Sequence, residues 1–158
     1  MSKQLFFILL IVLILSVFGA SFFYIRGLGD NMPNNTCVST ITNGQFIGDD
    51  LKSYVFNGTV TFRIKQSKIS VFAVIKEGED KSILRRDLLL DKIVINSTGI
   101  INTKVHQRYI YSTDTASDKR VLFSDRNEDI NLVFRRLRRG VYMAYVNDNW
   151  IMTCQEMK

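Results

Sequence analysis

The chain has a single histidine, and the sequence around it does not favour acid–base catalysis. His106 lies in an alternating segment in which Lys104 and Arg108 share its face. A catalytic base needs a carboxylate partner and a pocket, whereas these neighbours are cations. No Gly-x-Ser-x-Gly nucleophile motif is present. We therefore expect an exposed histidine and a protein that is not an enzyme.

An acidic stretch, Asp125–Asp129, superficially resembles the start of a calcium-binding loop. That motif requires glycine at its sixth position and glutamate at its twelfth, but the chain has Ile130 and Arg136 there. A calcium site is therefore rejected. One histidine and two cysteines also exclude a histidine-rich metal site, a four-thiolate zinc site and an iron–sulfur cluster. We predict no metal and no other cofactor.

The two cysteines lie far apart, at Cys37 and Cys154. A pair that brackets a domain is typical of an exported fold closed by a disulfide. Such a bond would stabilise the domain by at most ~4–5 kcal/mol in the chain-entropy model. In a reducing cytosol the same residues would be two idle or buried thiols. We favour the disulfide, which places the domain outside the cytoplasm.

The net charge is +6, and much of the excess comes from a cluster of Arg135, Arg136, Arg138 and Arg139. Nucleic-acid binding is not favoured, because an exported domain rarely meets nucleic acid and no aromatic residues are interleaved with the arginines. Contact with anionic lipid headgroups or with an acidic partner is the functional interpretation. The alternative is a solvated strand end and turn.

Residues 5–25 contain no charge, and 18 of these 21 residues are hydrophobic. A helix of this length spans about 31 Å, close to the hydrocarbon thickness of a bilayer. We predict a transmembrane signal-anchor helix at 5–25, after a cytosolic stub at 1–4 and before a flexible linker at 26–36. A cleaved signal peptide is the alternative. Lys3 weakly favours a cytoplasmic N-terminus.

Residues 37–158 form the second predicted domain, and they read as β structure throughout. Between Tyr54 and Lys65, apolar and polar residues alternate, as in a sheet with one wet face. The spacing of the strands favours an antiparallel β-barrel or sandwich. A short helix that starts after Ser124 is the alternative for residues 125–134. Ser82–Asn96 is mixed, and it is expected to contain either a bulge or two short strands. The other predicted strands are Tyr54–Lys65, Ile69–Lys76, Ile100–Tyr111, Val121–Phe123, Ile130–Leu137, Val141–Val146 and Trp150–Cys154.

A barrel of about eight strands has an interior that holds either its own side chains or one small apolar ligand. Seven residues are candidates to line such a pocket or simply to fill the core. They are Phe56, Phe62, Tyr109, Tyr111, Phe134, Met143 and Trp150. An open sheet edge would equally invite a partner through strand addition.

The layout of the chain resembles the FidL-like inner-membrane proteins of enterobacteria. The features that carry this resemblance are the anchor, an early Cys37, the segment Asn57–Phe62 and a terminal hairpin that begins at Gly140 and ends at Cys154. Ile83-Leu84-Arg85-Arg86 leading into Leu88-Leu89-Leu90 belongs to the same resemblance. The layout is more distantly similar to the ToxS and VtrC type of partners of ToxR-like transcription activators. That similarity implies a periplasmic, lipocalin-like barrel that pairs with a regulator, in some cases around a bile-salt-like ligand. No functional residue carries over by position.

These observations together favour a non-enzymatic, single-pass protein of the bacterial inner membrane. Its N-terminus would be cytoplasmic and its β domain periplasmic. The expected partners are the lipid bilayer and a membrane-bound, ToxR-like regulator, with a small apolar ligand as a further expectation and no direct contact with nucleic acid. The alternative is a structural or assembly factor of the cell envelope that senses no ligand.

Overall fold

The computed structural model describes residues 4, 10–21, 32–47, 51–96, 98–117, 129–147 and 150–157. The chain divides into two compact units, Met1–Asn31 and Met32–Lys158. Within the first unit, residues 10–21 form a helix whose side chains are exposed, from 43% at Leu10 to 72% at Phe18. Among the helices of the described residues, none is both long and apolar enough to cross a membrane. Residues 5–9 and 22–25 of the expected span lie outside the described part.

Within its described residues, the second unit contains nine strands and a single turn of 3-10 helix, η1 (Ile64–Gln66). Most strand boundaries agree with those predicted from the sequence. The strands are β1 (Cys37–Ile47), β2 (Ser53–Arg63), β3 (Lys68–Glu77), β4 (Asp80–Leu90), β5 (Val94–Ile95), β6 (Ile101–Ile110), β7 (Asp129–Arg138), β8 (Val141–Val146) and β9 (Trp150–Glu156).

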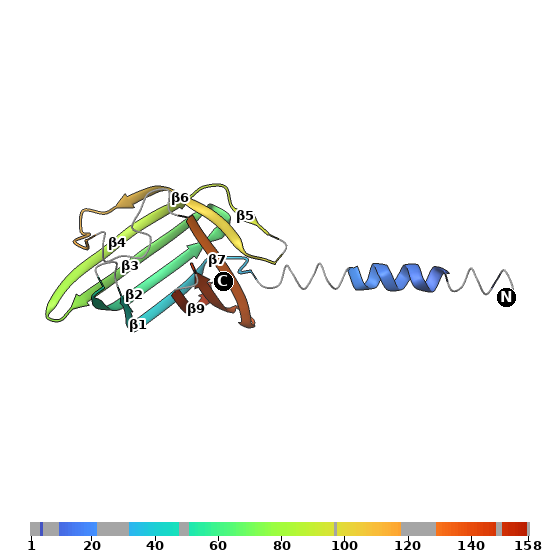
Figure 1. Cartoon of the computed structure of the whole chain (residues 1–158), viewed down its shortest axis with the longest axis horizontal. Coiled ribbons are helices and arrows are strands. Elements are labelled where there is room, and N and C mark those ends of the chain that lie inside the picture. Colours follow the sequence, from blue (N-terminus) through green and yellow to red (C-terminus); the bar gives the residue numbers. More distant parts are fainter. Residues whose placement is uncertain are drawn as a thin grey trace. The chain divides into compact units, whose positions relative to one another are not determined.

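All of the pairings are antiparallel, and they form a closed ring (Figure 1). The order β4-β3-β2-β1-β9-β8-β7-β6 returns to its start because β6 also pairs with β4. The short β5 pairs with the first two residues of β6. A sheet that closes on itself in this way leaves the members of the ring with two neighbours each. The predicted antiparallel β fold is therefore confirmed.

Burial alternates along the strands and defines an inner and an outer surface. In β2, Tyr54, Phe56, Val60 and Phe62 are all buried, whereas the residues between them are partly exposed. Gly58 lies on the same face of β2 as these four buried residues, and it is paired with Ala73 of β3. A Cβ atom at Gly58 would overlap the backbone and side chain of Ala73, so glycine is needed for this close approach.

The structure also refines the sequence-based boundaries. Ser82–Asn96 was predicted to contain either a bulge or two short strands, and it is divided between β4, which begins earlier at Asp80, and the two-residue β5. β7 begins at Asp129, so the strand rather than the alternative helix is formed from that residue onward. β1 was not predicted as a separate strand. The strand expected at Val121–Phe123 and residues 125–128 lie outside the described part.

Candidate functional site

The two cysteines form a disulfide at the seam where the ring of strands closes, which confirms the predicted pairing. Cys37 of β1 and Cys154 of β9 are buried, and their Cα atoms lie 5.5 Å apart. Among the described residues, β1 and β9 pair only through Cys37 with Glu156 and Val38 with Gln155. The covalent bond therefore reinforces the closure where the hydrogen-bonded ladder of the ring is shortest.

Two of the candidate lining residues meet across the interior of the domain. Phe62 of β2 and Phe134 of β7 are buried, and their ring centroids lie 5.5 Å apart in an edge-to-face arrangement. β2 and β7 are not neighbours in the sheet, so this contact joins opposite walls. At this level the space between the strands is occupied by the protein's own aromatic side chains.

A second aromatic cluster gathers near the end of β1 and the starts of β2 and β9. It is formed by Phe46, Tyr54, Phe56 and Trp150. Phe46 lies at the centre of the cluster, with ring centroids at 5.3 Å from Tyr54, 6.4 Å from Phe56 and 5.2 Å from Trp150. Phe56 is buried as predicted, and Trp150 is half-buried and packs against the core. These residues therefore act as core at this end of the domain.

The remaining two tyrosines do not line the interior: Tyr109 is 50% exposed and Tyr111 is 41% exposed. A register shift in β6 explains the difference. Leu90 of β4 pairs with Val105, but Leu89 pairs with Gln107, so one extra residue interrupts the alternation. Beyond this bulge the side chains of β6 exchange faces, because a shift of one residue reverses their direction.

Met143 also differs from the prediction. It lies between the buried Tyr142 and Ala144 of β8, so its side chain is half-buried on the outer surface. There it pairs with Arg135 of β7, and its sulfur accepts a hydrogen bond from the hydroxyl of Tyr145 at 2.7 Å. Met143 therefore covers the outside of the sheet instead of filling the core.

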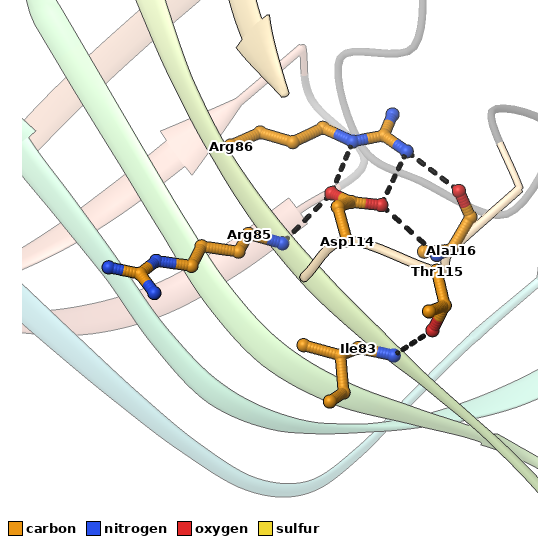
Figure 2. Close-up of polar contacts among 6 residues, drawn as sticks. All are labelled: Ile83, Arg85, Arg86, Asp114, Thr115 and Ala116. Carbon is orange, nitrogen blue, oxygen red and sulfur yellow. Dashed lines mark hydrogen bonds and ion pairs between the residues drawn. The ribbon is translucent and has the colours of Figure 1, made fainter. Parts of the chain in front are cut away.

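The most extensive polar site of the described residues is a buried ion pair between Arg86 and Asp114 (Figure 2). Arg86 lies on the inner face of β4, like Leu84 and Leu88, and it is only 3% exposed. Its Nε and one terminal nitrogen donate to the carboxylate of Asp114 at 2.8 and 3.1 Å. The same terminal nitrogen donates to the carbonyl of Ala116 at 2.8 Å.

The segment after β6 is held against β4 by hydrogen bonds between backbone N–H groups of β4 and side chains of the segment, as Figure 2 shows. The backbone N–H groups of Arg85 and Ala116 donate to the carboxylate of Asp114 at 2.9 and 3.0 Å. The N–H of Ile83 donates to the hydroxyl of Thr115 at 2.9 Å. The ion pair thus fixes a polar loop against the edge of β4, and no local pattern in the sequence predicts it.

The hydrogen bonds decide the protonation state of Asp114. Burial raises the pKa of its carboxyl, because the charged form loses water. The hydrogen bonds from Arg86 and from the N–H of Arg85 act in the opposite direction and outweigh burial, so the pKa lies below its ordinary value. Asp114 is therefore a carboxylate at neutral pH, matched to the Arg86 guanidinium.

On the outer surface, a second set of polar contacts surrounds Asp87. Lys68 lies 2.8 Å from its carboxylate, and the Tyr111 hydroxyl donates to the same oxygen at 2.7 Å. Burial raises the pKa of Asp87, but the hydrogen bonds from Lys68, Ser70 and Tyr111 outweigh it and hold the pKa below its ordinary value. The hydrogen bond to Asp87 raises the pKa of Tyr111.

Around these contacts lies an exposed surface that we call the aromatic face. Arg85 stacks on Tyr111, with its guanidinium carbon 4.6 Å from the ring centroid. A shallow hollow beside this pair is lined by side chains that include Thr59, Thr61 and Phe72. Phe72 is 53% exposed. The aromatic face consists of Phe72 of β3, Ile83 and Arg85 of β4, Tyr109 of β6 and Tyr111 just after it.

The other sequence candidates lie apart from the aromatic face. His106 is exposed on β6, and Asp129 pairs with Lys104 at 3.3 Å. No group of three or more His, Cys, Asp or Glu residues that could hold a metal occurs within the described ranges. The four arginines are exposed around the β7–β8 turn: Arg135, Arg136, Arg138 and Arg139.

Comparisons with protein-family models, curated proteins and solved structures find no match to this chain. The candidate site therefore rests on the molecule's own geometry. Its interior is packed with aromatic side chains, its loop is held by Arg86 and Asp114, and its exposed aromatic residues lie on one part of the outer surface.

Proposed function

We propose that the chain is a non-enzymatic, single-pass accessory protein of the bacterial inner membrane. Its lipocalin-like β domain would lie in the periplasm and bind the periplasmic domain of a membrane-bound, ToxR-like transcription regulator. The resemblance to FidL-like proteins and to ToxS and VtrC partners supports this class of function. The structure adds a surface on which such a partner could dock.

The anchor is supported by the sequence on both sides of the described helix. Residues 10–21 carry exposed apolar side chains that the β domain does not need for its core. The uncharged run continues from residue 5 to residue 25, long enough as a helix to cross the hydrocarbon core. The disulfide fits the same location, because such bonds persist in the oxidising periplasm.

The observation that carries the proposed binding role is the aromatic face. Tyrosine, arginine and phenylalanine are enriched at the centres of protein–protein interfaces, and tyrosine and arginine are common among the residues that dominate binding. Here three aromatic side chains and Arg85 are exposed together on adjacent strands. Hydrogen bonds and stacking already fix Tyr111, so less conformational entropy is lost when a partner binds.

The packed interior of the β domain favours the regulator, rather than a small molecule held inside the domain, as the main binding partner. Phe62 and Phe134 meet across the domain, and the aromatic cluster around Trp150 occupies the space near one end. A small apolar ligand would therefore bind at the joint surface with the regulator, next to the hollow beside Phe72. The aromatic face would then contribute to both recognition events.

The test is deletion and complementation in the bacterium that carries the protein. We expect deletion to change the transcript levels of one regulator's target genes, and the wild-type chain to restore them. A Phe72→Ser/Tyr109→Ser variant should fail to restore them although it folds, because both side chains are half exposed. The matched control, Ile151→Ser, changes an even more exposed apolar residue, on β9, and should complement fully.

Deletion that alters no regulator's targets would refute the regulatory role. A deletion strain whose cell envelope is weakened but whose transcript levels are unchanged would support the alternative, a structural or assembly factor of the cell envelope. Complementation by the double variant would show that the aromatic face is not the binding surface.

A further inference from the structure

We propose that one end of the β domain docks on the anionic lipid surface of the membrane. We call it the basic end and define it by Lys65, Lys92, Arg136, Arg138 and Arg139. This inference rests on the proposed anchor, and it assigns a second contact between the protein and the bilayer. It gives the arginine cluster a role that partner binding at the aromatic face does not require.

The topology brings these five cations to one end of the ring of strands. Lys65 lies in η1 between β2 and β3, and Lys92 lies between β4 and β5. The arginines surround the turn from β7 to β8, where Gly140 adopts a positive φ of 71°. In an up-and-down antiparallel sheet these connections all fall at the end where β1 begins.

The chain enters the β domain at this same end. The N–H of Asn35 donates to Glu156 at 2.7 Å, and the N–H of Met157 donates to the carbonyl of Thr36 at 2.8 Å. The entering segment therefore runs beside the last residues of β9. Only the six residues 26–31 separate the expected span from the unit that begins at Met32, and six extended residues reach at most about 22 Å.

The charges of the described residues are distributed unevenly between the two ends. Near the basic end the carboxylates are Asp91, which follows β4, and Glu156, which already accepts the bond from Asn35. At the opposite end, Glu77, Glu79 and Asp80 are balanced by three lysines, Lys52, Lys76 and Lys81, and Lys52 forms an ion pair with Glu77. An anionic surface therefore attracts the basic end, where cations are in excess, more strongly than the opposite end, where the two signs balance.

Two exposed apolar side chains accompany these cations. Leu137, between the arginines, is 52% exposed, and Met157, just after β9, is 56% exposed. Basic residues flanking an exposed apolar side chain are the composition of surfaces that rest at the headgroup boundary of a bilayer. Leu137 is therefore the residue expected to approach the acyl chains.

Tryptophan quenching in the full-length protein tests this contact. The chain has one tryptophan, Trp150, at the end remote from the arginines, so the wild type serves as a matched control. A Leu137→Trp/Trp150→Phe variant is reconstituted into nanodiscs that contain brominated lipids, either neutral or with 30% phosphatidylglycerol. We expect the fluorescence of this variant to be quenched at least twofold more in anionic than in neutral discs, and the Trp150 fluorescence of the wild type to change little.

Added Arg138→Gln/Arg139→Gln substitutions should abolish the anionic enhancement, as should high salt, which screens exposed charges. Lys76→Gln/Lys81→Gln, at the other end of β3 and β4, should leave it unchanged. A full chain that fails to enter nanodiscs would contradict the proposed anchor. A variant that enters them, but whose single indole at position 137 is quenched no more in anionic than in neutral discs, would overturn the docking inference and leave the anchor standing.

Discussion

The Arg86–Asp114 pair predicts that loss of one buried charge strongly destabilises the β domain. In Asp114→Asn, the Arg86 guanidinium keeps its charge at a site where the two side chains are 3% and 1% exposed. Breaking a buried pair in this way costs about 3–5 kcal/mol, because the remaining charge is left without its counterion. Stabilities of whole domains are about 5–15 kcal/mol, so this single change should remove a large part of the total.

The assay is urea denaturation of the full chain in a mild non-ionic detergent, with Trp150 fluorescence as the signal that reports unfolding. Asp129→Asn is the matched control, because its pair with Lys104 leaves side chains that are 73% and 56% exposed, and it should cost no more than about 0.5 kcal/mol. An Arg86→Met/Asp114→Leu variant should be more stable than Asp114→Asn, since no buried charge remains. A stability of Asp114→Asn within about 1 kcal/mol of the wild type would refute this reasoning, because a broken buried pair costs more than that.

The same pair predicts a pH dependence. The pKa of Asp114 is lower in the folded protein than its ordinary value near 3.8, so the unfolded chain binds the proton more readily. Its contribution is fully present above that ordinary value and is lost as the pH falls through the lowered pKa. Between about pH 5 and pH 2, Asp114→Asn should therefore lose less stability than the wild type does. Equal losses in the two proteins would contradict this assignment.

Three further changes test other parts of the fold. Cys154→Ser opens the seam of the ring and should cost about 2–5 kcal/mol, measured as a lower melting temperature that reductant reproduces in the wild type. Gly58→Ala places a Cβ against Ala73 and should cost about 1–3 kcal/mol by urea denaturation; an unchanged midpoint would contradict the close approach. Tyr111→Phe removes the donor to Asp87 and should cost about 0.5–1.5 kcal/mol, with one high-pKa phenol lost from the ultraviolet titration.

Much of the β domain could be predicted from the sequence because its strands alternate cleanly. In β2 the alternation of apolar and polar residues matches the alternation of burial, since one surface faces the core and the other faces water. The disulfide could be predicted for another reason. An exported domain with only two cysteines can form only one intramolecular disulfide, whatever its topology.

β1 could not be predicted as a strand because its pattern is interrupted. Its pairing with β2 shifts between Ile41 and Gly44, and Asn43 adopts a φ of 54° while its N–H donates to the side chain of Asn57 at 2.8 Å. This irregularity and the many polar residues hide the period of two. The strand is formed because it fills the gap in the ring between β2 and β9.

The misplaced tyrosines have a related cause. Ile101, Val105 and Tyr109 are four residues apart and would share a face in a regular strand, but the bulge after Val105 reverses that relation. A bulge depends on pairing with β4, which the sequence of β6 alone does not contain. Arg86 and Asp114 are likewise 28 residues apart, and their contact follows from the path of the loop rather than from any local pattern.

Site-specific photocrosslinking in intact membranes tests the central claim, binding through the aromatic face, most directly. A photoreactive phenylalanine derivative replaces Tyr109, which is 50% exposed, or Ile151, which is 63% exposed on β9, and mass spectrometry identifies the crosslinked species. We predict that position 109, but not position 151, captures a single-pass membrane protein with a cytosolic DNA-binding domain. Capture of only envelope-assembly components or copies of the chain, or equal capture from both positions, would contradict the account.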